Sequence, residues 1–173
     1  GVHVAQIDER IAPAGDPDRN LAHLRASLLE HAPLPADQIH AMEVEAPDVE
    51  VAAARYARVL EHIAGSPPVL DLAHLGLGPD GHTTSLVPGD PVLDVTDKDV
   101  ALTTTVYQGR RRMTLTYPTI NRSRRILWVV TGSEKVTMLP RLLAADRSIP
   151  AGRIDQEQAL LLADRAAAAG TKT

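Results

Sequence analysis

The sequence has no cysteine and no phenylalanine among its 173 residues, and only 2% of them are aromatic. The absence of cysteine excludes a disulfide framework and a thiolate zinc site, and it is typical of proteins from a reducing compartment. No apolar run approaches the ~20 residues that a membrane-spanning helix requires, and the chain does not open on a basic segment followed by an apolar one. We therefore expect a cytoplasmic protein that does not enter a membrane.

Acidic residues outnumber basic ones, which gives a formal net charge of -4 at pH 7. This balance argues against general binding to nucleic acid or to an anionic membrane surface. Basic residues are nevertheless concentrated at positions 110–112 and 122–125, where they could meet a small anion. A hydrophobic content of 44% and a charged content of 23% are those of an ordinary soluble domain, and the length suits one sizeable core. We expect a single domain over residues 1–173.

Strand-like and helix-like segments alternate along the chain. Strands are predicted at residues 2–7, 70–75, 101–106 and 112–116 and at Ile126–Val130, whose unbroken apolar composition indicates burial on both faces. Helices are predicted at residues 16–31, 48–63, 133–145 and 156–169, with Asp16 as the N-cap of the first helix and Pro17 in its first turn. Alternation of this kind predicts an α/β fold with a mostly parallel sheet.

Ligands of such sheets bind where loops follow the carboxyl ends of the strands. Three predicted loops stand out, at residues 8–10, 76–85 and 132–135. We expect all three to lie at one edge of the sheet, where they would form a shared site.

The middle loop belongs to the stretch LDLAHLGLGPDGHTTSLVPGD, residues 70–90. Gly76, Gly78 and Gly81 permit backbone conformations that are closed to other residues, and consecutive amides in such a loop can form a concavity that binds an anion. His82 follows them and can exchange protons near neutral pH. The spacing alone leaves a second interpretation open, in which the glycines serve only a tight turn and His82 is an exposed loop residue.

This stretch resembles the signature of the 6-phosphogluconolactonases, in which an apolar strand precedes a Gly-x-Gly-x-Asp-Gly-His-x-x-Ser-Leu loop. Three further segments are similar to that family and follow in its order: VHVAQIDERIAPAGDPDRN, RRMTLTYPTINRSRRILWVVTGSEK and IPAGRID. Together the four segments cover nearly the whole chain, so the resemblance is more specific than a single glycine loop.

The resemblance implies a three-layer, mostly parallel, Rossmann-like fold shared with glucosamine-6-phosphate deaminases and ribose-5-phosphate isomerases. It also implies an activity, the hydrolysis of 6-phospho-D-glucono-1,5-lactone to 6-phosphogluconate in the oxidative pentose phosphate pathway. The expected partner is therefore a phosphorylated sugar lactone, with no nucleic acid or membrane, and we expect no metal or organic cofactor.

Lactone opening requires a water to lose a proton as it attacks the carbonyl and the ring oxygen to gain one as it leaves. The resemblance implies that His82 does both, while Asp80 or Asp8 orients the loop or its water. Main-chain amides from Gly78 to Gly81 would stabilise the oxyanion. Asp80 has an alternative interpretation as an ordinary turn residue, because aspartate is common in turns.

The phosphate of such a substrate needs cationic donors. Arg10, Arg112 and Lys135 match family positions associated with binding the phosphorylated sugar, and all three fall at predicted strand ends or in the helix after one. The neighbours of Arg112 are also arginines, and such a run is also typical of a solvated face. Glu9 could pair with Arg10. The other histidines have no metal-ligand spacing and are expected at the surface or in the core.

The family normally begins with a further strand, loop and helix that carry a Ser-Gly-Gly-Ser/Thr-like phosphate-binding turn, and this sequence has no counterpart before Val2. We therefore expect an N-terminally truncated domain, either a fragment or a naturally short form, whose missing unit another chain could supply.

Two alternatives to the lactonase remain. One is a related sugar-phosphate isomerase or deaminase, although the deaminases favour Asp-Glu-Tyr where this chain has Asp8-Glu9-Arg10. The other is an inactive truncated homologue that binds a sugar phosphate without turning it over. Lactone hydrolysis, ammonia release and binding without turnover distinguish the three.

Overall fold

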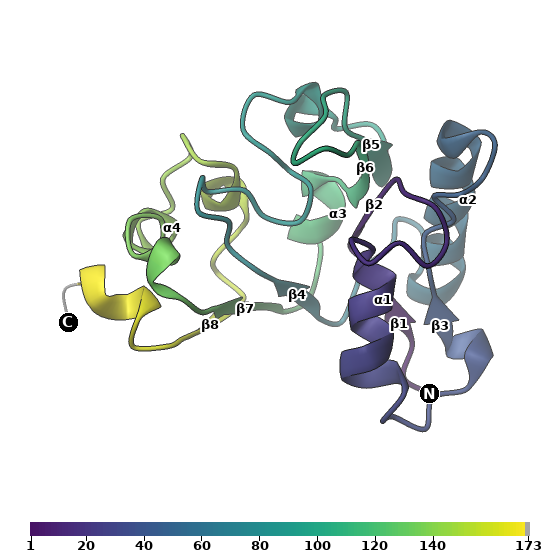
Figure 1. Ribbon diagram of the computed structural model, residues 1–173, viewed down its shortest axis with the longest axis horizontal. Coiled ribbons are helices and arrows are strands. Elements are labelled where there is room, and N and C mark those ends of the chain that lie inside the picture. Colours follow the sequence, from purple (N-terminus) through teal and green to yellow (C-terminus); the bar gives the residue numbers. More distant parts are fainter. Residues whose placement is uncertain (172–173) are drawn as a thin grey trace.

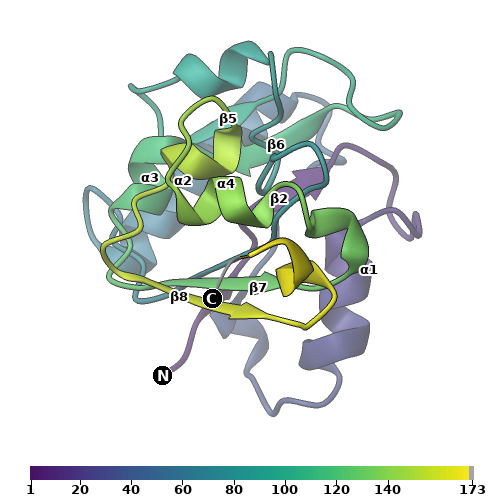
Figure 2. The ribbon, with the colours of Figure 1, turned by 90° about the vertical axis from the view of Figure 1, so that its left-hand side faces the viewer.

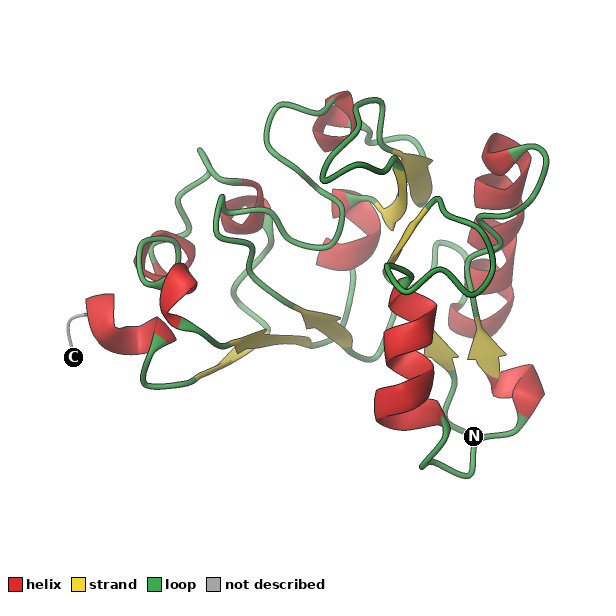
Figure 3. Cartoon of the chain, in the orientation of Figure 1, coloured by secondary structure: helices red, strands yellow, loops and turns green. Residues whose placement is uncertain are grey.

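The computed structural model describes residues 1–171. Its helices are α1 (Asn20–Leu24), α2 (Val49–Ala64), α3 (Tyr117–Asn121) and α4 (Leu139–Leu143). Its strands are β1 (Val4–Ala5), β2 (Asp8–Arg10), β3 (Ile39–His40), β4 (Ala73–Leu75), β5 (Val100–Leu102), β6 (Arg112–Leu115), β7 (Ile126–Val130) and β8 (Ala159–Ala163). Short 3₁₀ segments, among them Ser133–Lys135, connect several of these elements, and Figures 1 and 3 show their arrangement.

The strands form three small sheets. The sheets β1-β3 and β4-β7-β8 are parallel, as expected for an α/β fold, whereas β2-β6-β5 is antiparallel. The antiparallel sheet was not predicted. It arises because β5 and β6 form a hairpin whose turn has Gln108 and Gly109 at positive φ, 51° and 79°, the backbone geometry that suits a two-residue hairpin turn.

The segment Asp8-Glu9-Arg10 is strand β2, not the loop predicted at residues 8–10. It pairs with β6 so that Asp8 lies opposite Thr114 and Arg10 lies opposite Arg112. Alternate residues of a strand point to opposite faces. Glu9 is therefore fully buried on one side, while Asp8 and Arg10 share the other side with Arg112.

Helix α1 starts at Asn20, so Asp16 is not its N-cap as predicted. Asp16 instead accepts a hydrogen bond from the amide of Asp18 in the preceding turn. The helix start is capped from another element, because the Glu9 carboxylate accepts hydrogen bonds from the amides of Asn20 (2.7 Å) and Leu21 (2.9 Å). Capping at a distance leaves no local sequence signal, and for this reason the predicted N-cap, Asp16, lies three residues before the observed one, Arg19.

Helix α2 confirms the prediction for residues 48–63. The Asp48 side chain caps it by accepting from the amides of Glu50 and Val51, and Gly65 ends it at a φ of 87°. Its buried residues repeat at helical spacing and pack into the core: Ala52, Ala53, Tyr56 and Leu60.

The last predicted helix, at residues 156–169, is wrong. Its leucine run is strand β8, which pairs in parallel with all five residues of β7. Helix propensity is a weak preference, and here the open edge of β7 supplies a complete ladder of backbone partners that overrides it. The predicted helix at 133–145 is also divided, because α4 begins only at Leu139, with Pro140 in its first turn.

Strand β7 is buried on one face only, contrary to the prediction. Ile126, Trp128 and Val130 are buried, while Val129 on the opposite face is 38% exposed. Figure 2 shows α4 above β7 and β8. The other side of the sheet carries Val129, Leu160 and Leu162, all of them exposed within the part of the chain that the structure describes.

Candidate active site

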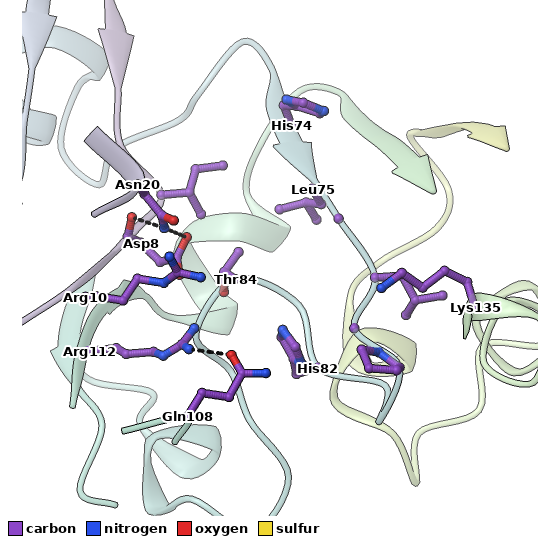
Figure 4. Close-up of a pocket in the computed structure, with 15 residues that line it drawn as sticks. Asp8, Arg10, Asn20, His74, Leu75, His82, Thr84, Gln108, Arg112 and Lys135 are labelled. Carbon is purple, nitrogen blue, oxygen red and sulfur yellow. Dashed lines mark hydrogen bonds between the residues drawn. The ribbon is translucent and has the colours of Figure 1, made fainter. Parts of the chain in front are cut away.

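A cavity of about 380 Å³ opens where the parallel sheet β4-β7-β8 meets the antiparallel sheet (Figure 4). The predicted site residues Asp8, Arg10, Gly78, His82, Arg112 and Lys135 all line it. The segments at residues 8–10, 76–85 and 132–135 therefore converge as predicted, even though the first of them is a strand. Asp80 and Gly81 are not part of the lining, although Asp80 contacts the His82 ring.

The glycine loop is shaped by close contacts that exclude side chains. A Cβ on Gly78 would lie 2.0 Å from His82 Nδ1, and Gly81, at a φ of +85°, would place a Cβ 2.7 Å from Ile149 Cβ. The amide of Gly78 donates to the His82 carbonyl at 2.8 Å, and that of Gly81 donates to the Gly78 carbonyl at 3.0 Å. These two amides are occupied within the loop, so the prediction that they bind an oxyanion is not supported by this geometry.

His82 is held through one ring nitrogen. Its Nδ1 lies 2.6 Å from Asp80 Oδ1 and 3.2 Å from the hydroxyl of Tyr107, and the same hydroxyl donates to Asp80 Oδ2 at 2.9 Å. The His82 side chain is only 17% exposed, so it is not the exposed loop residue of the second interpretation. A proton on Nδ1 satisfies Asp80 and leaves the lone pair on Nε2, the nitrogen that a general base needs.

Asp80 is suited to remain an anion beside this ring. Burial acts to raise the pKa of Asp80, but hydrogen bonds from the ring and the amide of His82 and from the Tyr107 hydroxyl outweigh it and lower the pKa below its ordinary value. The carboxylate therefore stabilises a positive charge on the imidazole whenever His82 takes up a proton.

Asp8 lies on another side of the cavity, next to Arg10 (Figure 4). Its carboxylate accepts hydrogen bonds from Ser85 Oγ (2.6 Å) and Asn20 Nδ2 (3.1 Å). Burial raises the pKa of Asp8 despite the Ser85 hydrogen bond and the nearby arginines. Because Ser85 follows the glycine loop, Asp8 anchors the far end of that loop to β2.

Arg10 and Arg112 form the cationic wall of the cavity. They are cross-strand neighbours, and their Nε atoms are buried without a hydrogen-bond partner among residues 1–171. Arg10 donates from Nη1 to the Asp18 carbonyl, and Arg112 donates from Nη2 to Gln108 Oε1 at 3.1 Å. Burial, followed by the charge of Arg10, lowers the pKa of Arg112. Two close guanidinium groups with free donors are suited to bind an anion such as phosphate.

Lys135 faces the cavity from the opposite side in Figure 4, with His82 between it and the two arginines. It ends the 3₁₀ segment Ser133–Lys135 that follows β7. Its Nζ lies 3.3 Å from the Glu134 carboxylate, and its side chain is 17% exposed. Lys135 therefore lies across the cavity from Arg10 and Arg112.

Glu9 does not pair with the Arg10 side chain, as one interpretation suggested. Its carboxylate accepts from the Arg10 amide and forms a buried ion pair with Arg19, at 3.0 Å. Glu9 therefore joins β2 to the start of α1 beneath the cavity.

Several residues of the site were not predicted from the sequence. Tyr107 contacts His82, while Asn20, Thr84 and Gln108 line the cavity. His74 also lines it, although the sequence placed it among unassigned histidines. The Gln108-Gly109 pair was a usable signal for a hairpin turn, but nothing local indicated which loop the hairpin covers.

The part of the chain that the structure describes has neither a metal-binding group of side chains nor a membrane-spanning helix. No group of three or more histidine or acidic side chains between residues 1 and 171 is placed to hold a metal ion. No helix among the same residues has the length and apolar character to cross a membrane.

Fold and site together define an α/β protein with a cationic cavity next to a histidine that an aspartate holds. A family model described as glucosamine-6-phosphate isomerases/6-phosphogluconolactonase matches residues 1–162. The 6-phosphogluconolactonase of Mycobacterium tuberculosis is 38% identical over 179 residues, which cover 97% of this chain and 72% of that protein. The human 6-phosphogluconolactonase is 38% identical over 146 residues, which cover 83% of this chain and 56% of that protein. The chain therefore belongs to the glucosamine-6-phosphate isomerase/6-phosphogluconolactonase family.

Solved structures agree with this assignment. The 6-phosphogluconolactonase of Thermotoga maritima is 28% identical and superimposes with a TM-score of 0.80 over 93% of this chain and 71% of that one. A monomeric glucosamine-6-phosphate deaminase superimposes with a TM-score of 0.83 over 97% of this chain and 74% of that one, at 20% identity, which shows a common fold.

Proposed function

We propose that this chain hydrolyses 6-phospho-D-glucono-1,5-lactone to 6-phosphogluconate, with His82 as the acid–base residue. The relatives at 38% identity are 6-phosphogluconolactonases, so the chain is a lactone hydrolase of the pentose phosphate pathway. The observation that carries the role of His82 is the 2.6 Å contact between its Nδ1 and Asp80, on a ring that lines a cationic cavity.

The chemistry follows from the tautomer of His82 that carries its proton on Nδ1 and its lone pair on Nε2. His82 Nε2 takes a proton from a water as the water oxygen forms a bond to the lactone carbonyl carbon, and Asp80 stabilises the imidazolium that results. The tetrahedral intermediate then collapses. Its bond to the ring oxygen breaks, and this oxygen takes the proton back from Nε2 to become a hydroxyl. The product carboxylic acid ionises, so each turnover releases one proton at neutral pH.

The arginine wall holds the phosphate in this proposal. Arg10 and Arg112 come from neighbouring strands and offer buried Nε donors, which gives a fixed, cationic surface for phosphate oxygens. Lys135 contributes from across the cavity. With the phosphate fixed at the wall, the lactone ring extends toward His82.

Asp8 has an indirect role. Its contacts to Ser85 and Asn20 connect the glycine loop to β2 and α1. It therefore fixes the distance between the arginine wall and His82, which a substrate with a phosphate at one end and a reacting carbonyl at the other requires.

Proton release from freshly prepared 6-phosphogluconolactone, measured with a pH indicator in the natural full-length protein, tests the function. The rate must be corrected for spontaneous opening of the lactone. Hydrolysis above that background supports the proposal. Ammonia release from glucosamine 6-phosphate would instead identify a deaminase, and binding of 6-phosphogluconate without turnover would identify an inactive homologue.

A further inference from the structure

Tyr107 lies at the end of the β5–β6 hairpin and covers the glycine loop. Its hydroxyl donates to Asp80 Oδ2 at 2.9 Å and lies 3.2 Å from His82 Nδ1. Its ring meets the imidazole edge to face, with ring centres 5.2 Å apart and planes at 67°. Tyr107 therefore contacts both members of the Asp80–His82 pair, from a segment about 25 residues further along the chain.

Tyr107 is itself held in place from two directions. Its backbone pairs with Arg110 across the turn, and Arg110 Nη2 is bound by Asp16 at 2.7 Å. On the cavity side, the Arg112 guanidinium carbon lies 4.9 Å from the centre of the tyrosine ring, a cation–π contact. The hydroxyl is thus presented to Asp80 by a fixed ring.

Asp80 needs such a partner. Its side chain is 36% exposed, so a carboxylate held only by His82 would be free to rotate and to exchange its second oxygen with water. The Tyr107 hydroxyl occupies that second oxygen. Burial, followed by the hydrogen bond to Asp80, also raises the pKa of Tyr107, so the hydroxyl remains a donor throughout the neutral range.

We propose that Tyr107 is a positioning residue: it locks the Asp80 carboxylate so that Asp80 keeps the proton of His82 on Nδ1 and Nε2 stays directed to the substrate. This inference rests on the proposed role of His82. Because Tyr107 acts through Asp80 and is not among the residues that line the cavity, it should serve the chemical step and not substrate affinity.

Tyr107→Phe removes only the hydroxyl and tests the proposal. Hydrogen bonds to charged groups are strong enough that kcat should fall by about tenfold, with KM changed less than twofold. The matched control is Tyr117→Phe, which also deletes a tyrosine hydroxyl bond, the one to the Pro150 carbonyl at 2.9 Å, but outside the cavity lining. The control should leave kcat unchanged. An equal fall in both variants, or none in Tyr107→Phe, would overturn the proposal.

A double-mutant cycle shows whether Tyr107 acts through Asp80. Asp80→Asn alone should lower kcat, and adding Tyr107→Phe should lower it less than twofold further, because the carboxylate that Tyr107 holds is already gone. Multiplicative losses would mean that Tyr107 acts independently, and the inference would be wrong.

The tautomer of His82 provides a readout that does not depend on turnover. In ¹⁵N-histidine-labelled protein, the His82 signals, assigned by their loss in His82→Asn, should show Nδ1–H in the parent and a mixture of tautomers in Tyr107→Phe. If the parent protein failed to hydrolyse the lactone but the tautomer changed as expected, the proposed function would fail and the positioning role would stand. An unchanged tautomer together with unchanged kcat would refute the positioning role alone.

Discussion

Replacement of His82 by asparagine is the most direct test of the mechanism. The asparagine amide can still donate to Asp80 Oδ1 in place of Nδ1–H, but it has no basic nitrogen. We therefore expect kcat to fall by 10²–10⁴-fold, the usual cost of losing a general acid–base group. At about 1.36 kcal/mol for each factor of ten, this corresponds to about 3–5 kcal/mol of transition-state stabilisation.

The expected change in stability is much smaller. His82 is not part of the apolar core, but it contributes a hydrogen bond to a partly exposed carboxylate and an edge-to-face contact with the Tyr107 ring. Since asparagine retains part of a hydrogen bond worth about 1 kcal/mol and loses a ring contact worth about 1 kcal/mol, the free energy of unfolding should fall by about 1–2 kcal/mol. Substrate affinity should also survive, because Arg10 and Arg112 are unchanged.

The assay compares lactone hydrolysis above background with urea unfolding of the same two proteins. A folded His82→Asn variant that keeps kcat within threefold of the parent would show that His82 is not the base. A fall in kcat together with a fall of several kcal/mol in the free energy of unfolding would instead indicate a structural defect. This variant would then give no support to the catalytic role of His82.

The sequence predicted the part of the site that is local in the chain. The spacing of Gly78, Gly81 and His82 predicts a glycine loop that leads to a histidine, although it left open whether that histidine is exposed. The structure shows that the ring packs so close to Gly78 that a Cβ there would clash with it. Asp80 likewise lies two residues from the ring that it holds. Such short-range geometry follows from the residues themselves.

The remaining features depend on contacts between distant segments. Tyr107 reaches His82 only because β5 and β6 form a hairpin, and Glu9 caps α1 from a neighbouring strand. The leucines of β8 follow the open edge of β7 instead of their helix propensity. In each case the deciding partner is far away in sequence, so neither composition nor periodicity could indicate it.

Three further predictions follow from the geometry. Arg10→Ala and Lys135→Ala should each raise KM for the phosphorylated lactone by about tenfold or more, but should hardly affect KM for glucono-1,5-lactone. A similar rise in KM for both lactones would show that the replaced side chain does not bind the phosphate. Gly78→Ala should lower kcat by displacing His82, and an unchanged kcat would mean that the loop adapts. Glu9 is fully buried, and although burial acts to raise its pKa, the hydrogen bonds from Gln6 and the helix amides outweigh it, so its pKa lies below the ordinary 4.5. The stability it contributes is therefore present above pH 4.5 and is lost as the pH falls through the lowered pKa. Glu9→Gln, which breaks the buried pair with Arg19, should cost about 3 kcal/mol at pH 7 and less at pH 3, as measured by urea unfolding at both pH values; an equal cost at both would show that the charge of Glu9 does not stabilise the fold.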